Sequence, residues 1–194
     1  EQLRSGWGAL LKPLAWQGAL CYCPSSSSKA TFTHPASFLT NWNGLPDPAE
    51  AAPAVITRYL SAYGPATPET FDAWLSRNSN RKSTLRGWFA SLGEQVVEVR
   101  VEGETRYLLA EHEDELAATR PSRATHLLGA FDQFVLGPGT KDTHMLASEH
   151  RSLVSKAAGW IAPVLTRGGR ITGVWDMDDG NLVVTPFPGE QAPP

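Results

Sequence analysis

The sequence predicts an α+β protein in which helical modules with short β-hairpins precede a small antiparallel β-sheet or barrel-like domain. Apolar residues recur at helical spacing between residues 50 and 92, and pairs of short alternating segments are joined by turn residues. Three more alternating segments follow one another over 161–187. The chain has 194 residues, of which 41% are hydrophobic and 19% charged, a balance typical of globular proteins.

Composition excludes several classes of protein. No stretch approaches the ~20 consecutive apolar residues that a membrane span needs, and no basic-then-apolar signal peptide opens the chain. The net charge is −3, so the chain is not uniformly basic, and any contact with nucleic acid must rest on a local patch. Two cysteines exclude a disulfide scaffold.

Residues 1–40 are predicted to be the C-terminal part of a first module, a helix followed by a hairpin. Pro13 is expected to end or kink the helix, because proline lacks an amide donor and clashes with the preceding turn. Residues 19–23 and 29–33 are predicted strands, joined by the loop 24–28. The chain opens without Met and already in helical periodicity, so we expect a piece of a longer chain. The predicted helix face is Leu3, Trp7, Leu10, Leu11 and Leu14.

A linker candidate over 41–53, rich in Pro, Asn, Gly and Asp, leads into a second predicted module, residues 50–118. Gly64-Pro65 is expected to stop a first helix. Thr67 is a good N-cap for a second helix, and Pro68 suits its first position. The inward faces of these two helices are predicted to be Val55, Ile56, Tyr59, Leu60, Tyr63, Phe71, Trp74 and Leu75.

A third helix and a hairpin complete this module. Gly93 lies where a glycine commonly ends a helix. Residues 96–101 and 105–109 are predicted strands around a tight turn at Glu102-Gly103. Three helices followed by a hairpin in this length are the plan of a winged helix. Residues 1–40 have the same ending, a helix followed by a hairpin. The sequence therefore predicts tandem winged helix-turn-helix modules. The inward face of the third helix is predicted to be Leu85, Trp88, Phe89 and Leu92.

Residues 124–188 are predicted to form a C-terminal β-rich domain. Strands are expected at 161–166, 170–176 and 182–187, joined by tight turns as a meander. Residues 148–158 are predicted to include a short helix, and 189–194 a frayed tail. Two interpretations stay open for Asp132, which lies among aromatic residues in an apolar run: a functional acid, or a residue that caps a local turn or faces away from the core.

No catalytic residue, metal site or cofactor is predicted. Cys21 and Cys23 share one face of a predicted strand near His34, but no fourth ligand accompanies them, and two small buried hydrophobes explain them better. His144 and Glu149-His150 match no metal or catalytic spacing, and Glu149 and His150 are expected to be solvated near the start of a helix. The nucleophile elbow, the P-loop and the dinucleotide-binding glycine motif are all absent from the sequence.

The third helix of the middle module is the candidate DNA-contacting element. Residues 76–93 contain four Lys or Arg and no acid, while acids crowd into 94–115. In a helix-turn-helix the second helix of the pair enters the major groove, and cations near its N-terminus reach phosphates. Gly87 lowers helix stability by ~1 kcal/mol relative to alanine. Close approach of the helix to a groove would explain a glycine here, and neutral drift would also allow it. The predicted contacts are Arg81, Lys82, Ser83, Thr84 and Arg86, with Arg106 on the hairpin and Lys12 in the first helix.

Four segments resemble a large bacterial family of winged-helix DNA-binding domain-containing proteins. They are Tyr59–Leu75, Leu127–Gly137, Gly159–Pro163 and Gly169–Trp175. The family is related to DNA glycosylases that unhook interstrand cross-links and excise alkylated bases, the AlkZ and YcaQ group. The resemblance implies tandem winged helices followed by a β-barrel-like domain, here the C-terminal portion of the protein. The family's catalytic motif is a Gln, an apolar residue, then Gln or Asp. No glutamine of this chain fits that pattern.

Two hypotheses of function therefore stay open. The first is a DNA-binding module, part of a DNA-repair protein of the cross-link or alkylated-base glycosylase type, with double-stranded DNA as partner and a cytoplasmic, nucleoid-associated location. The second is a winged-helix and β-barrel scaffold for protein or small-molecule interaction. The full-length protein is then a candidate glycosylase, while the 194-residue chain alone is expected to lack base-excision activity. The sequence does not settle the oligomeric state or the lesion and sequence preference.

Overall fold

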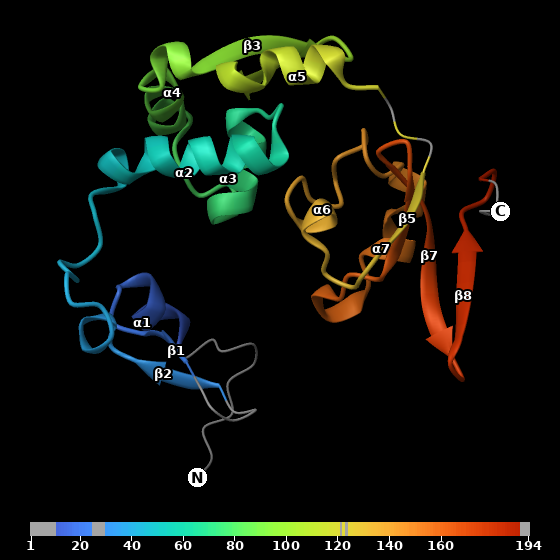
Figure 1. Ribbon diagram of the computed structural model, residues 1–194, viewed down its shortest axis with the longest axis horizontal. Helices are drawn as coiled ribbons and strands as arrows, with labels where there is room; N and C mark the ends of the chain where they lie inside the picture. The colour runs from blue at the N-terminus through green and yellow to red at the C-terminus, as the bar shows by residue number, and fades with distance from the viewer. Residues whose placement is uncertain (1–10, 25–29, 121, 123, 191–194) are drawn as a thin grey trace. The chain divides into compact units, whose positions relative to one another are not determined.

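The computed structural model describes residues 11–24, 30–120, 122 and 124–190. The chain divides into two compact units, unit 1 (Glu1–Ala51) and unit 2 (Ala52–Pro194), each described by itself below (Figure 1). The fold is mixed α and β with small antiparallel sheets, as the sequence predicted. Three predicted features fall wholly or partly outside the described residues: the helix face over Leu3 to Leu10, the loop 24–28 and the tail 189–194.

Unit 1 contains a short helix and a two-stranded hairpin. Helix α1 (Lys12–Trp16) has Pro13 in its first turn, so the proline stands at the start of the helix and does not end it, contrary to the prediction. The missing amide donor of proline has no intrahelical partner to lose at that position. Strands β1 (Cys21–Cys23) and β2 (Thr31–Thr33) pair antiparallel and confirm the predicted hairpin, with strands shorter than expected. The 3₁₀-helix η2 (Pro35–Ser37) follows.

Unit 2 opens with three helices around one apolar core. They are α2 (Pro48–Tyr63), whose first residues belong to unit 1, α3 (Pro68–Ser76) and α4 (Lys82–Ala90). Thr67 caps α3 as predicted, since its hydroxyl accepts from the Thr70 amide at 3.1 Å. The buried core comprises Ala52, Ile56, Tyr59, Leu60, Ala66, Phe71, Leu85, Phe89, Leu92 and Leu109.

Two residues predicted to face inward lie nearer the surface. Leu75 is 44% exposed, which corrects the prediction: it occupies the last turn of α3, beyond the reach of the core. Trp74 is 40% exposed but keeps one ring face on the core, with its centroid 5.1 Å from that of Tyr59.

A hairpin of β3 (Val96–Val101) and β4 (Glu104–Leu109) follows the helices. Val101 pairs with Glu104, so Glu102-Gly103 forms the turn, and both have positive φ, at 47° and 90°. The hairpin is joined to the helices by an isolated bridge between Ala66 and Tyr107. The 3₁₀-helix η4 (Ala110–His112) and helix α5 (Glu113–Ala118) end this part of unit 2.

The turn between α3 and α4 is organised by a buried carboxylate, Asp72, which is 2% exposed. Ser76 donates its hydroxyl to this carboxylate, and Asn80 donates both its side-chain amide, at 2.7 Å, and its backbone amide, at 3.2 Å. Burial acts to raise the pKa of Asp72, but these hydrogen bonds outweigh it and hold the pKa below its usual value. Between the donors, Arg77 and Asn78 adopt left-handed conformations, with φ of 59° and 63°. Asp72 thus sets where α4 begins.

The C-terminal part of unit 2 is a four-stranded antiparallel sheet in the order β5-β6-β7-β8 (Figure 1). Its core comprises Val135, Met145, Leu146, Val154, Ile161, Val164, Ile171 and Phe187. The predicted meander is confirmed as β6 (Val164–Arg167), β7 (Arg170–Asp178) and β8 (Asn181–Pro186). The fourth strand, β5 (Thr125–Leu128), had not been separated from the apolar run that follows it.

Helical segments complete this part of unit 2. After β5, the apolar run turns into the short helix α6 (Gln133–Leu136). The predicted helix within 148–158 is divided into η5 (Ser148–His150), α7 (Arg151–Val154) and η6 (Ala157–Gly159). Of the helices in the described ranges, none is long and apolar enough to cross a membrane.

Specific contacts join the helices of unit 2 to its C-terminal sheet. The Tyr63 ring lies so close to Gly137 that no larger residue would fit there, and its hydroxyl donates to Gln133 Oε1 at 3.0 Å. At the tip of the β3–β4 hairpin, Glu102 lies 2.7 Å from His144 Nδ1 and 3.5 Å from Arg170. The hairpin is thereby tied to the segment that precedes α7 and to strand β7.

Removing the charge of Asp72 should destabilise unit 2. In Asp72→Asn an amide NH₂ faces the donors of Ser76 and Asn80, so we expect a loss of about 1–3 kcal/mol at neutral pH. The folded pKa is lowered, so the stabilisation is complete above the unfolded pKa of ~3.9 and disappears as pH falls through the folded value.

Urea unfolding of the parent and of Asp72→Asn between neutral and acidic pH measures this difference. The exposed Glu149→Gln is the matched control and should change stability by less than ~0.5 kcal/mol. A stability gap between parent and Asp72→Asn that stays constant across the whole pH range would contradict the prediction.

Candidate nucleic-acid interface

Helix α4 divides into a face that packs and a face that is open. Leu85 and Phe89 are each 3% exposed, and Phe89 contacts the rings of Phe71 and Tyr107, with centroids 5.8 and 5.1 Å apart. Trp88 is half-buried against the same core, as predicted. The remaining positions of the helix and its N-cap are exposed: Arg81, Lys82, Ser83, Thr84, Arg86, Gly87 and Ala90.

The structure therefore gathers five of the seven predicted contact residues on one helix. Within the described ranges, no carboxylate lies within 4.0 Å of the charged groups of Arg81, Lys82 or Arg86. Two hydroxyls, of Ser83 and Thr84, lie in the first turn beside them. These cations and hydroxyls are the groups that contact phosphate oxygens in DNA complexes.

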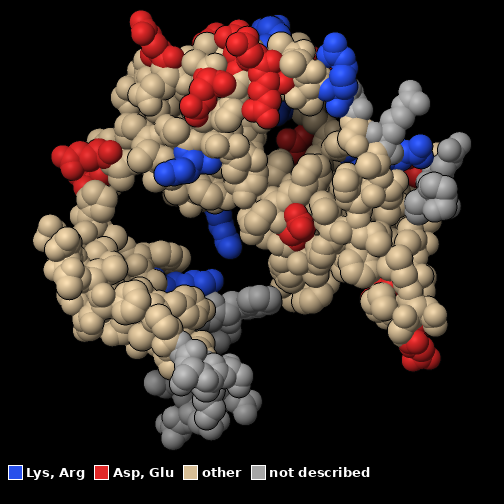
Figure 2. All heavy atoms as spheres, viewed as in Figure 1, with Lys and Arg blue, Asp and Glu red and all other residues tan. Residues whose placement is uncertain are grey.

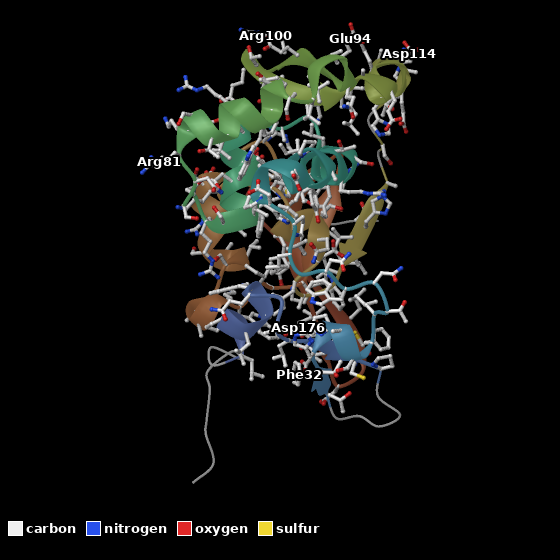
Figure 3. All side chains as sticks on the ribbon, turned by 90° about the vertical axis from the view of Figure 1, so that its left-hand side faces the viewer. Phe32, Arg81, Glu94, Arg100, Asp114 and Asp176 are labelled. Atoms are coloured by element: carbon white, nitrogen blue, oxygen red, sulfur yellow. The ribbon has the colours of Figure 1, made fainter. Side chains whose placement is uncertain are left out.

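The N-terminus of α4 adds a further feature that suits an anion. Arg81 is the N-cap residue, and its side chain makes no capping hydrogen bond. The first amides of the helix are therefore not satisfied by the cap side chain, and the helix dipole favours negative charge there. Figure 3 shows the Arg81 side chain extending away from the ribbon at the start of the helix.

Arg106 and Lys12 are placed differently from the other predicted residues. The Arg106 side chain is only 11% exposed and is engaged by Glu104 at 3.2 Å and Asp142 at 4.0 Å. It also donates to the Pro65 carbonyl at 3.5 Å, so it joins parts of unit 2 and is not open to a partner. Lys12 is exposed on α1, in unit 1.

A hollow of about 430 Å³ lies beside α4, between the helix and the hairpin. Arg86 and Phe89 line it from α4, and Glu98 and Tyr107 line it from β3 and β4. Burial raises the pKa of Tyr107, and the neighbouring Glu98 raises it further. Arg86 thus stands at the boundary between the open face of α4 and this hollow.

Acidic residues gather elsewhere on unit 2. Figure 2 shows them over η4 and α5, the segments of unit 2 that contain Glu111, Glu113, Asp114 and Glu115. The turn of the hairpin is also acidic, through Glu102 and Glu104, but these are paired with His144, Arg106 and Arg170. The cations of α4 are thus separate from the acids of η4 and α5, while Glu98 on β3 lines the hollow beside Arg86.

The other residues considered for chemistry have local structural roles. Asp132 caps α6 by accepting from the Phe134 amide at 2.8 Å, which agrees with the capping interpretation. Cys21 and Cys23 are half-buried, and no group of three His, Cys, Asp or Glu within the described ranges could hold a metal ion. His150 was expected to be solvated, but it is half-buried, and its ring lies 4.4 Å from that of Phe187.

His144 and Asp72 are structural residues that the sequence did not reveal. His144 lies between Glu102 and Glu104, with its Nε2 3.7 Å from Glu104. No local pattern signals this contact, because the partners are distant in sequence. Asp72 did have a signal: an acid on the inward face of a helix, four residues before Ser76 and eight before Asn80, in a polar turn.

Comparisons with known proteins agree with this arrangement. The sequence profile of the family described as DNA glycosylase AlkZ-like matches residues 2–191. The chain is 58% identical over 195 residues to an interstrand DNA cross-link repair glycosylase of Streptomyces sahachiroi, covering 100% of this chain and 53% of that protein. A solved structure of the DNA glycosylase AlkZ from Streptomyces sahachiroi is similar with a TM-score of 0.91 and 57% identity, over 99% of this chain and 52% of that one. The chain spans about half the length of these relatives.

Replacing Gly87 with alanine should stabilise the protein. Gly87 is exposed in the interior of α4, and a Cβ added there meets no atom within 4 Å. The fold therefore does not require glycine, and Gly87→Ala should add about 0.5–1 kcal/mol through helix propensity. Thermal unfolding measures the change.

Gly173→Ala is the matched control, because its Cβ would lie 2.6 Å from the Thr185 carbonyl oxygen, and it should lower the unfolding temperature. A loss of stability in Gly87→Ala would contradict the prediction.

Proposed function

This chain belongs to the AlkZ-like DNA glycosylase family, and from that premise we propose that it binds double-stranded DNA as part of a DNA-repair glycosylase for cross-linked or alkylated bases. The observation that carries the proposal is the exposed face of α4, where three cations and two hydroxyls stand without acidic partners among the described residues. The names of the relatives support the reaction class.

We further propose that the chain contains tandem winged helices. The order α2, α3, α4, β3, β4 and the bridge between Ala66 and Tyr107 support this description of residues 50–118. Helix α1 and the hairpin β1–β2 support the last part of another winged helix over residues 1–40. Residues 124–188 are then the β-rich domain that follows.

In the proposed complex, α4 faces the major groove of the duplex. Arg81, Lys82 and the first-turn amides bind phosphates, while Arg86 lies farther along the same helix. Glycine at position 87 leaves this face without a side chain and lets the helix approach the groove closely. Lys12, in unit 1, is a further phosphate contact in this proposal. Arg106 is not part of it, because its guanidinium is engaged by Glu104 and Asp142.

The proposed role of these residues is to hold the duplex in place and not to break bonds. Phosphate contacts fix the register of a protein on DNA without reading its sequence, and they make binding dependent on salt. The Gln–apolar–Gln or Gln–apolar–Asp motif of the family is absent from the 194 residues. In this proposal the catalytic groups of the glycosylase therefore come from outside this chain.

Reversing two charges on α4 should remove DNA binding without unfolding the protein. Lys82 and Arg86 are exposed, so Lys82→Glu with Arg86→Glu should change stability by less than ~0.5 kcal/mol per site. Repulsion from phosphates should lower the affinity for a paired duplex by about tenfold or more at low salt, and the affinity of the parent should fall steeply as salt rises. Fluorescence anisotropy measures both quantities.

Two further variants separate binding from folding. Arg151→Glu with Lys156→Glu reverses two exposed cations away from α4 and should bind almost as the parent does. Trp88→Ala should lose about 3–5 kcal/mol, because the ring packs on the core. If the α4 variant binds as tightly as the parent, helix α4 does not contact the duplex, and the scaffold for protein or small-molecule interaction becomes the preferred function.

The 194-residue chain should show no base excision by itself. No glutamine of the chain lies in the family's catalytic motif. The assay is strand cleavage at abasic sites after incubation with alkylated or cross-linked duplex, with the heat-denatured protein as background. Turnover well above that background would place catalytic residues inside this chain.

A further inference from the structure

The hairpin of unit 1 presents an aromatic pair to solvent. Tyr22 on β1 and Phe32 on β2 are direct partners in the antiparallel register, with ring centroids 4.9 Å apart and planes inclined by 34°. Tyr22 is 74% exposed and Phe32 is 42% exposed. Phe32 is labelled on strand β2 in Figure 3.

The fold of the hairpin does not account for this exposure. Side chains alternate between the two faces of a strand, and Cys21, Cys23 and Thr33 are half-buried on the opposite face. Burying an aromatic ring stabilises a protein far more than an exposed cross-strand pair does. Within the described residues of unit 1 both rings are open, so the pair is available to a partner.

The charge of the surrounding sequence indicates the chemistry of that partner. Residues 2–46 contain no Asp or Glu, although the whole chain has 20 of them. The same stretch holds three cations, Arg4, Lys12 and Lys29, and Lys12 is exposed on α1. A segment that combines cations, no acids and exposed ring faces is complementary to a polyanion that carries aromatic groups.

We propose that the β1–β2 hairpin is a second nucleic-acid contact, where Tyr22 and Phe32 stack on bases that are unpaired or displaced from the helix. In an intact duplex the faces of each base are covered by its neighbours, so an exposed ring can stack only where a base has lost that cover. Single-stranded, bulged and lesion-distorted DNA supply such bases. This inference rests on the proposed function only in taking DNA as the ligand, because the hairpin lies in unit 1 and α4 lies in unit 2.

The test compares affinities for three labelled DNAs by fluorescence anisotropy: a paired duplex, the same duplex with a bulge of unpaired thymines, and a single strand. Tyr22→Leu with Phe32→Leu keeps apolar side chains but removes both ring faces. It should weaken binding to the bulged duplex and the single strand by about tenfold, because stacking is worth ~1–3 kcal/mol per base. Its affinity for the paired duplex should change less than about twofold.

Tyr22→Phe is the matched control, since it keeps the ring and should bind every DNA as the parent does. A second readout is ultraviolet cross-linking of 5-iodouracil placed in the bulge, with mass spectrometry of the attached peptide. The expected peptide contains Tyr22 or Phe32.

Failure of this inference and failure of the α4 proposal give different results. If the double Leu variant binds bulged and single-stranded DNA as tightly as the parent, the inference is overturned and the pair faces another protein. If the hairpin variant loses that binding while charge reversal on α4 has no effect on the paired duplex, the hairpin contact stands and the proposed role of α4 fails.

Discussion

The buried carboxylate of Asp72 is the constraint on which the exposed face of α4 depends. A helix of nine residues has little stability of its own, so its direction must come from its packing and from the turn before it. Asp72 gathers the donors of Ser76 and Asn80, and these hydrogen bonds hold Arg77 and Asn78 in left-handed conformations that side chains rarely adopt. Without the carboxylate, the turn would lose its fixed shape and α4 its fixed start.

A second set of contacts connects the helices and the hairpin of unit 2 to its C-terminal part. The Tyr63 ring lies against Gly137, and Glu102 at the tip of the hairpin contacts His144 and Arg170. Arg106 belongs to the same set, because its guanidinium lies between Glu104 and Asp142. A hairpin held in this way is a firm support for α4, which packs against it through Phe89 and Tyr107.

The distribution of charge links the two proposed contacts. The chain is acidic overall, yet acids are absent from residues 2–46 and again from 76–93, the stretches that contain the β1–β2 hairpin and helix α4. Acids are concentrated instead on η4 and α5, and those at the hairpin turn lie beside Arg106 and Arg170. A net charge of −3 is therefore compatible with local attraction of a polyanion, because salt largely screens interactions between exposed charges that are more than about 10 Å apart.

The sequence by itself determined the local elements of this protein, because the signals for them lie within a few residues. The Thr67-Pro68 helix start, the Glu102-Gly103 turn and the alternation over 161–187 each specify a local backbone conformation, and the structure has all three. Helical spacing likewise placed Arg86 on the open face of α4. Tertiary structure alone decided that Arg106 is enclosed by Asp142 and the Pro65 carbonyl, because these segments meet it only after folding. A side chain's charge can be read from the sequence, but its availability to a partner depends on which distant groups reach it first.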